Sequence, residues 1–260
     1  MQSEPKTLLE AVRYYSDKTR CVNILAGIRW QNGVTCPVCA WLLTNARNGI
    51  SSCEVARSLG VTQKTAWFML HRIREAHANK SFEKLSGTVE VDETYIGGLE
   101  KNRHFDKKKS HGGSDGKTIV FGGVERDGKV QARVIERLHS ESLQNQVLAT
   151  VKIGSTLYTD EAPAFNALGI VYDHASVNHK NGEYVKGDVS TNNIENYWSL
   201  VKRMLKGTYI HVEPLYLNRY LNEQGFRYDN RKSDDATRFM ATLSNVTGCR
   251  LTYERLTNHE

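Results

Sequence analysis

The segment TVEVDETYIGG, which occupies residues 88–98, decides the fold of this chain. Its first residues alternate in polarity: Val89 and Val91 fall on one side of an extended chain, while Glu90 and Asp92 fall on the other. This period of two predicts a half-buried β-strand, and the two glycines that follow end it. Neighbouring carboxylates repel one another, so the segment indicates either a bound cation or a solvated edge strand with acidic side chains.

Two later stretches favour the cation. Residues 155–161, STLYTDE, predict a second short strand that ends in Asp160. Residues 190–206 repeat apolar side chains at helical spacing, and Glu195 falls in the first turn on the neighbouring polar face. Two strand-end aspartates and one helical glutamate predict an oxygen-rich, three-carboxylate site, which is the ligand set that Mg²⁺ or Mn²⁺ prefers. The N-cap candidates of the helix are Ser190, Thr191 and Asn192.

Three stretches together, VEVDETYIGG, YTDEAPAF and NNIENYWSLVKR, resemble the DDE transposases of bacterial insertion sequences, specifically the ISXO-like group. The resemblance runs from about Trp41 to the C-terminus. It implies an α/β fold, an RNase H-like mixed sheet flanked by helices. It also implies that Asp92, Asp160 and Glu195 form a metal-binding triad for Mg²⁺ or Mn²⁺. Lys202, seven positions after Glu195, matches the basic residue that the family places farther along the same helix.

Two features of this helix bear on the triad. Some members of the resembling group have Asn at the third position, which would point to Asn192, Asn193 or Asn196, although Glu195 fits the helix face and the spacing better. In the family a His commonly precedes the Thr-Asn pair at the start of the helix. This chain has Ser190 there.

The composition is that of a globular protein, with 39% hydrophobic and 25% charged residues. No apolar run approaches the length of a membrane span, about 18 residues, so we expect no membrane partner. An odd number of cysteines, five, argues against a disulfide framework and for a cytoplasmic protein. The net charge of +6 lies wholly in residues 1–80, which hold 11 Lys and Arg against 5 Asp and Glu. This excess predicts a polyanion-binding surface there.

Residues 41–80 predict a helix-turn-helix DNA-binding region, with an ordinary helical hairpin as the alternative. Residues 51–59 form one helix in this interpretation, Gly60 ends it, and Thr62 caps a second helix. Early residues of such a second helix suit base edges, and later ones suit phosphates. The predicted DNA-binding residues are Gln63, Lys64, Thr65, Arg72 and Arg74.

Residues 1–40 contain Cys36-Pro-Val-Cys39, which is half of a zinc ribbon. A ribbon needs a second cysteine pair roughly 15–20 residues on, and this chain has none. We therefore expect a truncated zinc-ribbon-like segment without Zn²⁺, which would be poorly ordered or would pack through apolar side chains alone. Those side chains are Leu8, Val12, Ile24 and Trp30. The ligands, if a zinc site exists, would be Cys21, Cys36, Cys39 and Cys53.

The predicted domains are the zinc-ribbon-like segment at residues 1–40, the helix-turn-helix region at 41–80, the RNase H-like catalytic domain at 81–210 and a C-terminal helical extension at 211–260. Within the catalytic domain, two β-rich runs flank an Asp-Gly turn and predict a hairpin. A helix, two more strands and the helix that carries Glu195 follow. This order fits a mixed sheet with helices on its faces.

As a DDE transposase, the chain would bind terminal inverted repeats and hydrolyse a phosphodiester at each transposon end. The freed 3′-hydroxyl would then attack target DNA, and the protein would act as a homo-oligomer on the DNA ends. Two alternatives remain open at this point. One is a catalytically defective remnant that only binds DNA, and the other is an RNase H-like nuclease that cuts without strand transfer.

Overall fold

The computed structural model describes residues 7–16, 36–78, 83–97, 117–160, 163–177, 187–246 and 249–257. The chain divides into two compact units. The helical unit consists of Met1–Ala78, Gly207–Tyr209 and Asn230–Glu260, and the sheet unit consists of Asn79–Lys206 and Ile210–Asp229. Across the described ranges, every helix is too short or too polar to span a bilayer.

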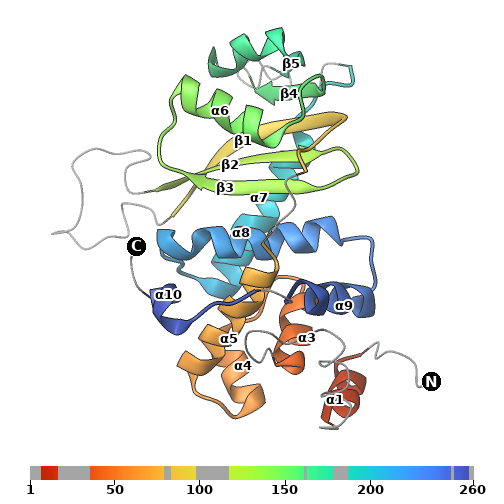
Figure 1. The fold of residues 1–260 in the computed structure, drawn as a ribbon, viewed down its shortest axis with the longest axis vertical. Helices are drawn as coiled ribbons and strands as arrows, with labels where there is room; N and C mark the ends of the chain where they lie inside the picture. Colours follow the sequence, from red (N-terminus) through yellow and green to blue (C-terminus); the bar gives the residue numbers. More distant parts are fainter. Residues whose placement is uncertain are drawn as a thin grey trace, which may run out of the picture. The chain divides into compact units, whose positions relative to one another are not determined.

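The described part of the sheet unit contains one five-stranded sheet (Figure 1). Its strands are β1 (Thr88–Ile96), β2 (Thr118–Glu125), β3 (Val130–Ile135), β4 (Thr156–Asp160) and β5 (Asp173–Val177). They lie in the order β3-β2-β1-β4-β5. β2 is antiparallel to β1 and β3, whereas β4 is parallel to β1 and β5 is parallel to β4. The predicted mixed sheet and its Asp-Gly hairpin between β2 and β3 are confirmed.

Helices cover both faces of this sheet. The helices are α6 (Ser140–Thr150), the 3₁₀ helix η3 (Pro163–Ile170), α7 (Asn192–Met204) and α8 (Pro214–Asp229). Figure 1 shows α6 and α7 on opposite sides of the central strands and α8 beside β3. Val91 and Phe121 pack with Leu143 of α6 on the first side. Ile194 and Trp198 of α7 are buried on the second, so the predicted apolar stripe is confirmed.

Strand β3 lies at an edge of the sheet, and α8 occupies part of that edge. Asn218 Oδ1 accepts a hydrogen bond from the Val134 N–H at 2.8 Å, and Asp229 Oδ1 accepts one from the Val130 N–H at 2.8 Å. An unpaired edge N–H is a template for pairing with another strand, so these two side chains block that pairing.

The described helices of the helical unit come from both ends of the chain. They are α1 (Leu8–Ser16), α3 (Pro37–Asn45), α4 (Ser52–Leu59), α5 (Gln63–Ala76), α9 (Asp235–Val246) and α10 (Tyr253–Thr257). The rings of Trp41 in α3 and Phe239 in α9 meet edge to face, 5.2 Å apart. Thr44 and Thr242 share a buried hydrogen bond of 2.9 Å. α9 therefore completes the core of the N-terminal helices.

The predicted pair of short helices, α4 and α5, is confirmed, as are the predicted end at Gly60 and the predicted cap by Thr62, and the structure adds a cap by Ser51. Ser51 Oγ accepts a hydrogen bond from the Glu54 N–H, and Thr62 Oγ1 accepts one from the Thr65 N–H. Gly60 ends α4 with a left-handed φ of 66°, which glycine adopts without a Cβ clash.

The unit boundaries differ from the predicted domains. α3 runs continuously across the expected boundary between residues 40 and 41. The predicted C-terminal extension, residues 211–260, is divided: α8 belongs to the sheet unit, and α9 and α10 belong to the helical unit. The reason is that α8 carries the side chains that bind β3, whereas α9 carries Phe239.

Candidate active site

Asp92 and Asp160 come from neighbouring strands. β1 and β4 are parallel, and Glu90 of β1 is level with Tyr158 of β4. Both strands continue by two residues in the same direction, to Asp92 and Asp160. Because residues two apart on a strand face the same side, both aspartates belong to the face of the sheet that α7 covers.

Trp198 fixes α7 over Asp92. Its indole Nε1 donates a hydrogen bond of 3.0 Å to Asp92 Oδ2. The ring also lies against Gly122, the β2 residue opposite Asp92: a Cβ at Gly122 would be 2.6 Å from Trp198 Cη2. The sequence pattern assigns Trp198 only to an apolar stripe. An indole N–H that faces an acidic strand is the signal that indicates its second role.

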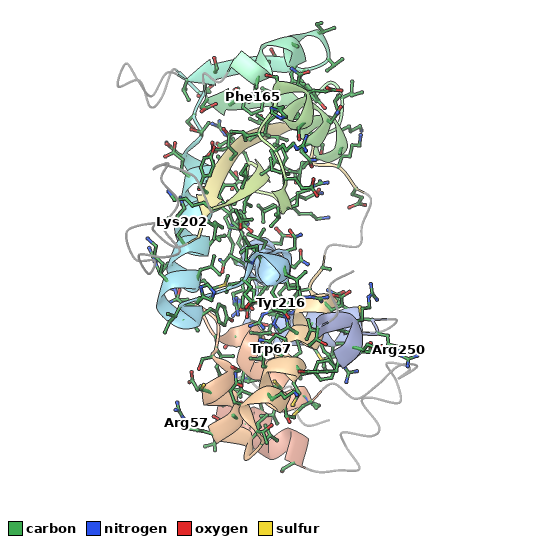
Figure 2. All side chains as sticks on the ribbon, turned by 90° about the vertical axis from the view of Figure 1, so that its left-hand side faces the viewer. Arg57, Trp67, Phe165, Lys202, Tyr216 and Arg250 are labelled. Carbon is green, nitrogen blue, oxygen red and sulfur yellow. The ribbon has the colours of Figure 1, made fainter. Side chains whose placement is uncertain are left out.

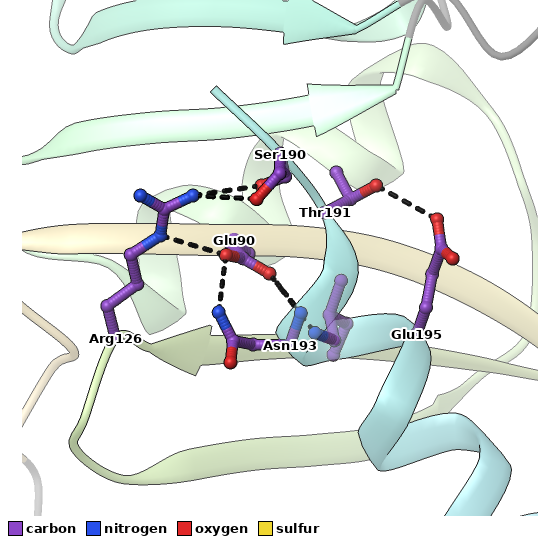
Figure 3. A network of polar contacts seen from close by, with 7 residues as sticks. Glu90, Arg126, Ser190, Thr191, Asn193 and Glu195 are labelled. Atoms are coloured by element: carbon purple, nitrogen blue, oxygen red, sulfur yellow. Dashed lines mark hydrogen bonds and ion pairs between the residues drawn. The ribbon is translucent and has the colours of Figure 1, made fainter. Parts of the chain in front are cut away.

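Glu195 projects from the first turn of α7 and is exposed. Thr191 Oγ1 donates a hydrogen bond of 3.0 Å to Glu195 Oε1, as Figure 3 shows. The negative charge of Glu195 contributes to the raised pKa of Asp92, so the two carboxylates act on one another. Lys202 lies two turns farther along α7 and is half-buried (Figure 2).

The electrostatics of this face disfavour ionised carboxylates. Burial raises the pKa of Asp92 to about 6, and the charges of Asp160 and Glu195 add to this effect. The Trp198 hydrogen bond acts in the opposite direction. On the opposite face of β1, burial likewise raises the pKa of Glu93 to about 7, with further contributions from Asp92 and Asp160. Glu93 Oε2 is buried and has no hydrogen-bond partner among the described residues.

The donor set at this face fits a hard divalent cation in its chemistry. It consists of carboxylate oxygens that repel one another, and a cation would relieve that repulsion. Among the described residues, however, no group of three His, Cys, Asp or Glu side chains is arranged to hold a metal ion. The assignment of Asp92, Asp160 and Glu195 as metal ligands therefore stays a prediction.

Glu90 lies on the face that strand alternation predicts, but its surroundings differ from the prediction. It shares the face of Asp92, yet its side chain is completely buried and makes an ion pair with Arg126. Asn193, at the start of α7, donates two further hydrogen bonds to it (Figure 3). Period-two alternation identifies a face but not what covers it, so the sequence alone predicts a solvated or cation-binding role for Glu90. The signal that could have found its role is Arg126 in the predicted hairpin turn, directly after β2.

Three predicted DNA-binding residues, Gln63, Lys64 and Thr65, are exposed at the start of α5. Lys64 Nζ lies 4.8 Å from the centroid of the Tyr253 ring, so α10 of the helical unit lies beside this end of α5. Figure 2 shows the exposed Arg57 of α4 reaching outward from the same unit.

The two remaining predicted DNA-binding residues are less accessible. Arg72 is half-buried, with its guanidinium 5.9 Å from the Phe68 ring centroid. Arg74 is only 1% exposed, and its guanidinium lies over the Tyr209 ring at 5.0 Å. The predicted exposed position of Arg74 is wrong, because it follows Leu70 by four residues and so falls on the buried side of α5.

The cysteine pair also differs from its predicted setting. Cys36 is the N-cap residue of α3 and Cys39 lies within that helix, fully buried in the core of the helical unit. Burial raises the pKa of the Cys39 thiol to about 12, with a smaller contribution from Cys36. Leu8 is 46% exposed, so its predicted packing role is wrong. The possible zinc ligand Cys21 and the predicted packing residues Ile24 and Trp30 lie outside the described residues, as does the side chain of Val12.

Comparison with known proteins identifies relatives. Residues 84–229 match the family model of the ISXO2-like transposase domain. An uncharacterised protein in transposable element ISH50 of Halobacterium salinarum is 26% identical, over 75% of this chain and 85% of that protein. A crystal structure of a pre-cleavage Mos1 transpososome aligns with 94% of this chain and 92% of its own chain, at 12% identity and a TM-score of 0.35. A crystal structure of the mariner Mos1 paired end complex with Mg aligns with 95% of both chains, at 11% identity and a TM-score of 0.33.

Proposed function

Since this chain belongs to the ISXO2-like transposase domain family, we propose that it binds the ends of an insertion sequence and catalyses phosphodiester hydrolysis followed by DNA strand transfer. In this proposal the sheet unit is an RNase H-like catalytic domain. The helical unit carries a helix-turn-helix that binds the terminal inverted repeats. The protein acts in the cytoplasm as a homo-oligomer that holds the DNA ends.

One observation carries the catalytic part of the proposal. Asp160 is the last residue of β4 and Asp92 lies in the middle of the neighbouring parallel strand β1, both on the face that α7 covers through the hydrogen bond from Trp198 to Asp92. Glu195 precedes Trp198 by three residues, which is one helical turn, and so belongs to the same region of α7. Three carboxylates from three separate elements are the arrangement that hard-cation catalysis of phosphoryl transfer requires.

The residues have distinct roles in this mechanism. Asp92, Asp160 and Glu195 would hold Mg²⁺ or Mn²⁺, whose charge favours deprotonation of the attacking water and stabilises the attacking and leaving oxygens. Thr191 holds the Glu195 carboxylate, and Trp198 holds the Asp92 carboxylate. Lys202 contacts a phosphate of the bound end as a point charge.

The DNA-binding part of the proposal rests on α4 and α5. Both helices are short, both are capped, and a left-handed glycine joins them. Gln63, Lys64 and Thr65 are exposed at the start of α5, where a recognition helix contacts base edges. Arg72 is half-buried on a later turn and contacts the DNA backbone.

A strand-transfer assay tests this function. Labelled element ends are incubated with Mg²⁺, a target plasmid and wild-type protein, and integrated product is expected. Asp160→Asn should remove both cleavage and integration. Asp173→Asn is the matched control, because Asp173 is an exposed aspartate in the neighbouring strand β5. It should keep full activity.

The same assay separates the alternatives. Cleavage of the ends without integration would identify a nuclease that lacks strand transfer. A shifted DNA band with no chemistry in Mg²⁺ or Mn²⁺ would identify a remnant that only binds DNA. Either result would overturn the strand-transfer proposal.

A further inference from the structure

Glu90 is an acid with no exposed surface, and its carboxylate is nevertheless saturated with hydrogen bonds. Oε1 accepts from Arg126 Nε at 2.9 Å and from Asn193 Nδ2 at 2.8 Å. Oε2 accepts from the Asn193 N–H at 2.7 Å and from the Ile194 N–H at 3.2 Å. A carboxylate has about four acceptor sites, and these four donors fill them. A buried charge is tolerated when its hydrogen bonds are satisfied in this way.

Two of these donors are the backbone amides of the first turn of α7. A helix leaves its first N–H groups without partners, and the side chain of the N-cap residue usually accepts from them. The N-cap residue of α7 is Thr191, and its side chain makes no such cap. Thr191 Oγ1 donates instead to Glu195. Glu90, from a strand about a hundred residues earlier, therefore provides the cap that Thr191 does not.

Arg126 connects this cap to its surroundings. It lies in the turn between β2 and β3, and its second donor nitrogen binds Ser190 Oγ at 2.9 Å. Its guanidinium also lies 4.8 Å from the centroid of the Tyr158 ring in β4. One arginine thus contacts β1, β4 and the residue that precedes the N-cap of α7, as Figure 3 shows in part.

We propose that Glu90 is a positioning residue that sets the orientation of Glu195 by capping α7 from β1, an inference that rests on the proposed function. Glu90 and Asp92 lie two residues apart on one face of β1. Glu90 binds the start of α7, and Asp92 binds Trp198, one turn later. Two attachments on one strand prevent α7 from rotating about its axis or sliding along it. Because Glu195 lies between them, its carboxylate is directed to the Asp92 site.

The competing explanation is that Glu90 only stabilises the fold. A second buried acid serves as the matched control. Glu223 in α8 is also completely buried, and it makes an ion pair with Arg227 at 2.6 Å within its own helix. Its loss removes a buried ion pair of the same sheet unit and leaves the start of α7 unchanged.

The test compares Glu90→Gln with Glu223→Gln in the full-length protein. Gln has one acceptor oxygen in place of two, so an N–H donor must face either the α7 amides or Arg126 and the Asn193 side chain, and the cap is weakened without a large change of volume. Amide hydrogen exchange at Asn193 and Ile194 should become at least about tenfold faster in Glu90→Gln and stay unchanged in Glu223→Gln. The kcat for cleavage should fall at least about tenfold with KM for the DNA end unchanged, because misplacement of a catalytic group by about 1 Å can cost a hundredfold in rate.

Equal behaviour of the two variants, in exchange or in kcat, would overturn the inference. If Glu90→Gln does not fold, Arg126→Gln provides the second measurement, since Arg126 is 28% exposed and its loss leaves the carboxylate in place. It should show the same two effects at smaller size, and an unchanged exchange rate would again overturn the inference. A wild-type protein that is inactive on DNA would contradict the proposed function alone. The exchange measurement would still decide whether Glu90 caps α7.

Discussion

At the scale of single residues, Asp92 is subject to opposing influences. Burial and the charges of Asp160 and Glu195 favour its protonated form, and the indole of Trp198 favours the ionised form. The first group dominates, since the pKa is raised to about 6. An ionised Asp92 therefore destabilises the metal-free protein at neutral pH, and a cation would remove that cost.

Asp92→Asn is expected to abolish cleavage while it stabilises the metal-free fold. The pKa of Asp92 in the folded state lies above the unfolded value of about 4. Its contribution to the stability of the fold is therefore fully present below pH 4 and is lost as pH rises through about 6. In Asp92→Asn the side chain cannot ionise, so this loss of stability does not occur. In EDTA its Tm should match that of wild type near pH 4 and exceed it at pH 7, by an amount that corresponds to roughly 1–3 kcal/mol. A Tm difference that does not change with pH would contradict this account.

Gly122→Ala is expected to impair catalysis through Trp198. The new Cβ would be 2.6 Å from the indole ring, so the ring and its hydrogen bond to Asp92 must move. Overpacking of this kind costs roughly 1–3 kcal/mol in stability, and kcat should fall about tenfold or more. Gly123→Ala is the control, because its Cβ would face the opposite side of the sheet, with Leu85 as the nearest neighbour at 3.1 Å. Equal kcat values for the two variants would show that Trp198 does not position Asp92.

Single residues also show where sequence patterns stop being informative. The sequence predicts Asp92 and Asp160 at strand ends. Asp160 is the last residue of β4, but the prediction is wrong for Asp92, because β1 continues to Ile96. Their common face follows from the local period of two. The sequence does not predict the burial of Glu90, since it depends on donors from α7 and from the turn that follows the neighbouring strand β2. The burial of Arg74 was missed because its positive charge was given more weight than its helical position.

At the scale of elements, the exposed and buried basic side chains of α5 are expected to respond differently to substitution. Lys64→Ala and Arg72→Ala should weaken binding to the transposon end and should each reduce the salt slope of log K by about 0.9. Arg74→Ala should leave the slope unchanged and lower Tm, because Arg74 is buried in the helical unit. Fluorescence anisotropy at several salt concentrations measures the slope. Lys152→Ala, an exposed lysine of the sheet unit, is the neutral control. A slope that changes only with Lys152 would move the DNA-binding surface to the sheet unit.

The position of the cysteine pair in α3 predicts that the protein binds no structural zinc ion. Cys39 is buried within a helix, and its raised thiol pKa opposes the thiolate that zinc requires. Protein purified without chelator should hold no stoichiometric Zn²⁺ in metal analysis. The Cys36→Ser and Cys39→Ala double variant should keep its DNA affinity, with a loss of stability of about 1 kcal/mol from the smaller side chain at position 39. One tightly held zinc per chain, lost in this variant, would show a complete site.

The elements themselves were largely predictable. The strands, the helix at residues 190–206 and the two caps around Gly60 follow from local signals: alternation, helical spacing and residues such as Ser51 and Thr62. The cap of α7 was not predictable in the same way. The sequence offers three N-cap candidates at the start of the helix, yet the side chain that accepts from its amides is Glu90, which is distant in sequence. Tertiary contact replaced a local one.

At the scale of the whole molecule, the order of segments along the chain does not match their division between the two units. The sheet unit is almost continuous in sequence, since only Gly207–Tyr209 interrupts it. The helical unit is discontinuous and needs residues from both ends of the chain. A division of the sequence into successive blocks could not show this, because the contact between Trp41 and Phe239 joins helices about two hundred residues apart.

This difference predicts unequal behaviour of the two parts when the chain is cut. A fragment of residues 79–229 contains both helical layers of the sheet and the Glu90 network, so it should unfold cooperatively on heating. A fragment of residues 1–78 lacks Phe239 and Thr242, and therefore lacks part of its core and the hydrogen-bond partner of Thr44. It should show helical circular dichroism without a cooperative transition, because an incomplete core does not offset the entropy of folding. Addition of a peptide of residues 230–260 should restore the transition and, with it, binding to the transposon end. A cooperative transition in residues 1–78 alone would show that α9 is dispensable for that core.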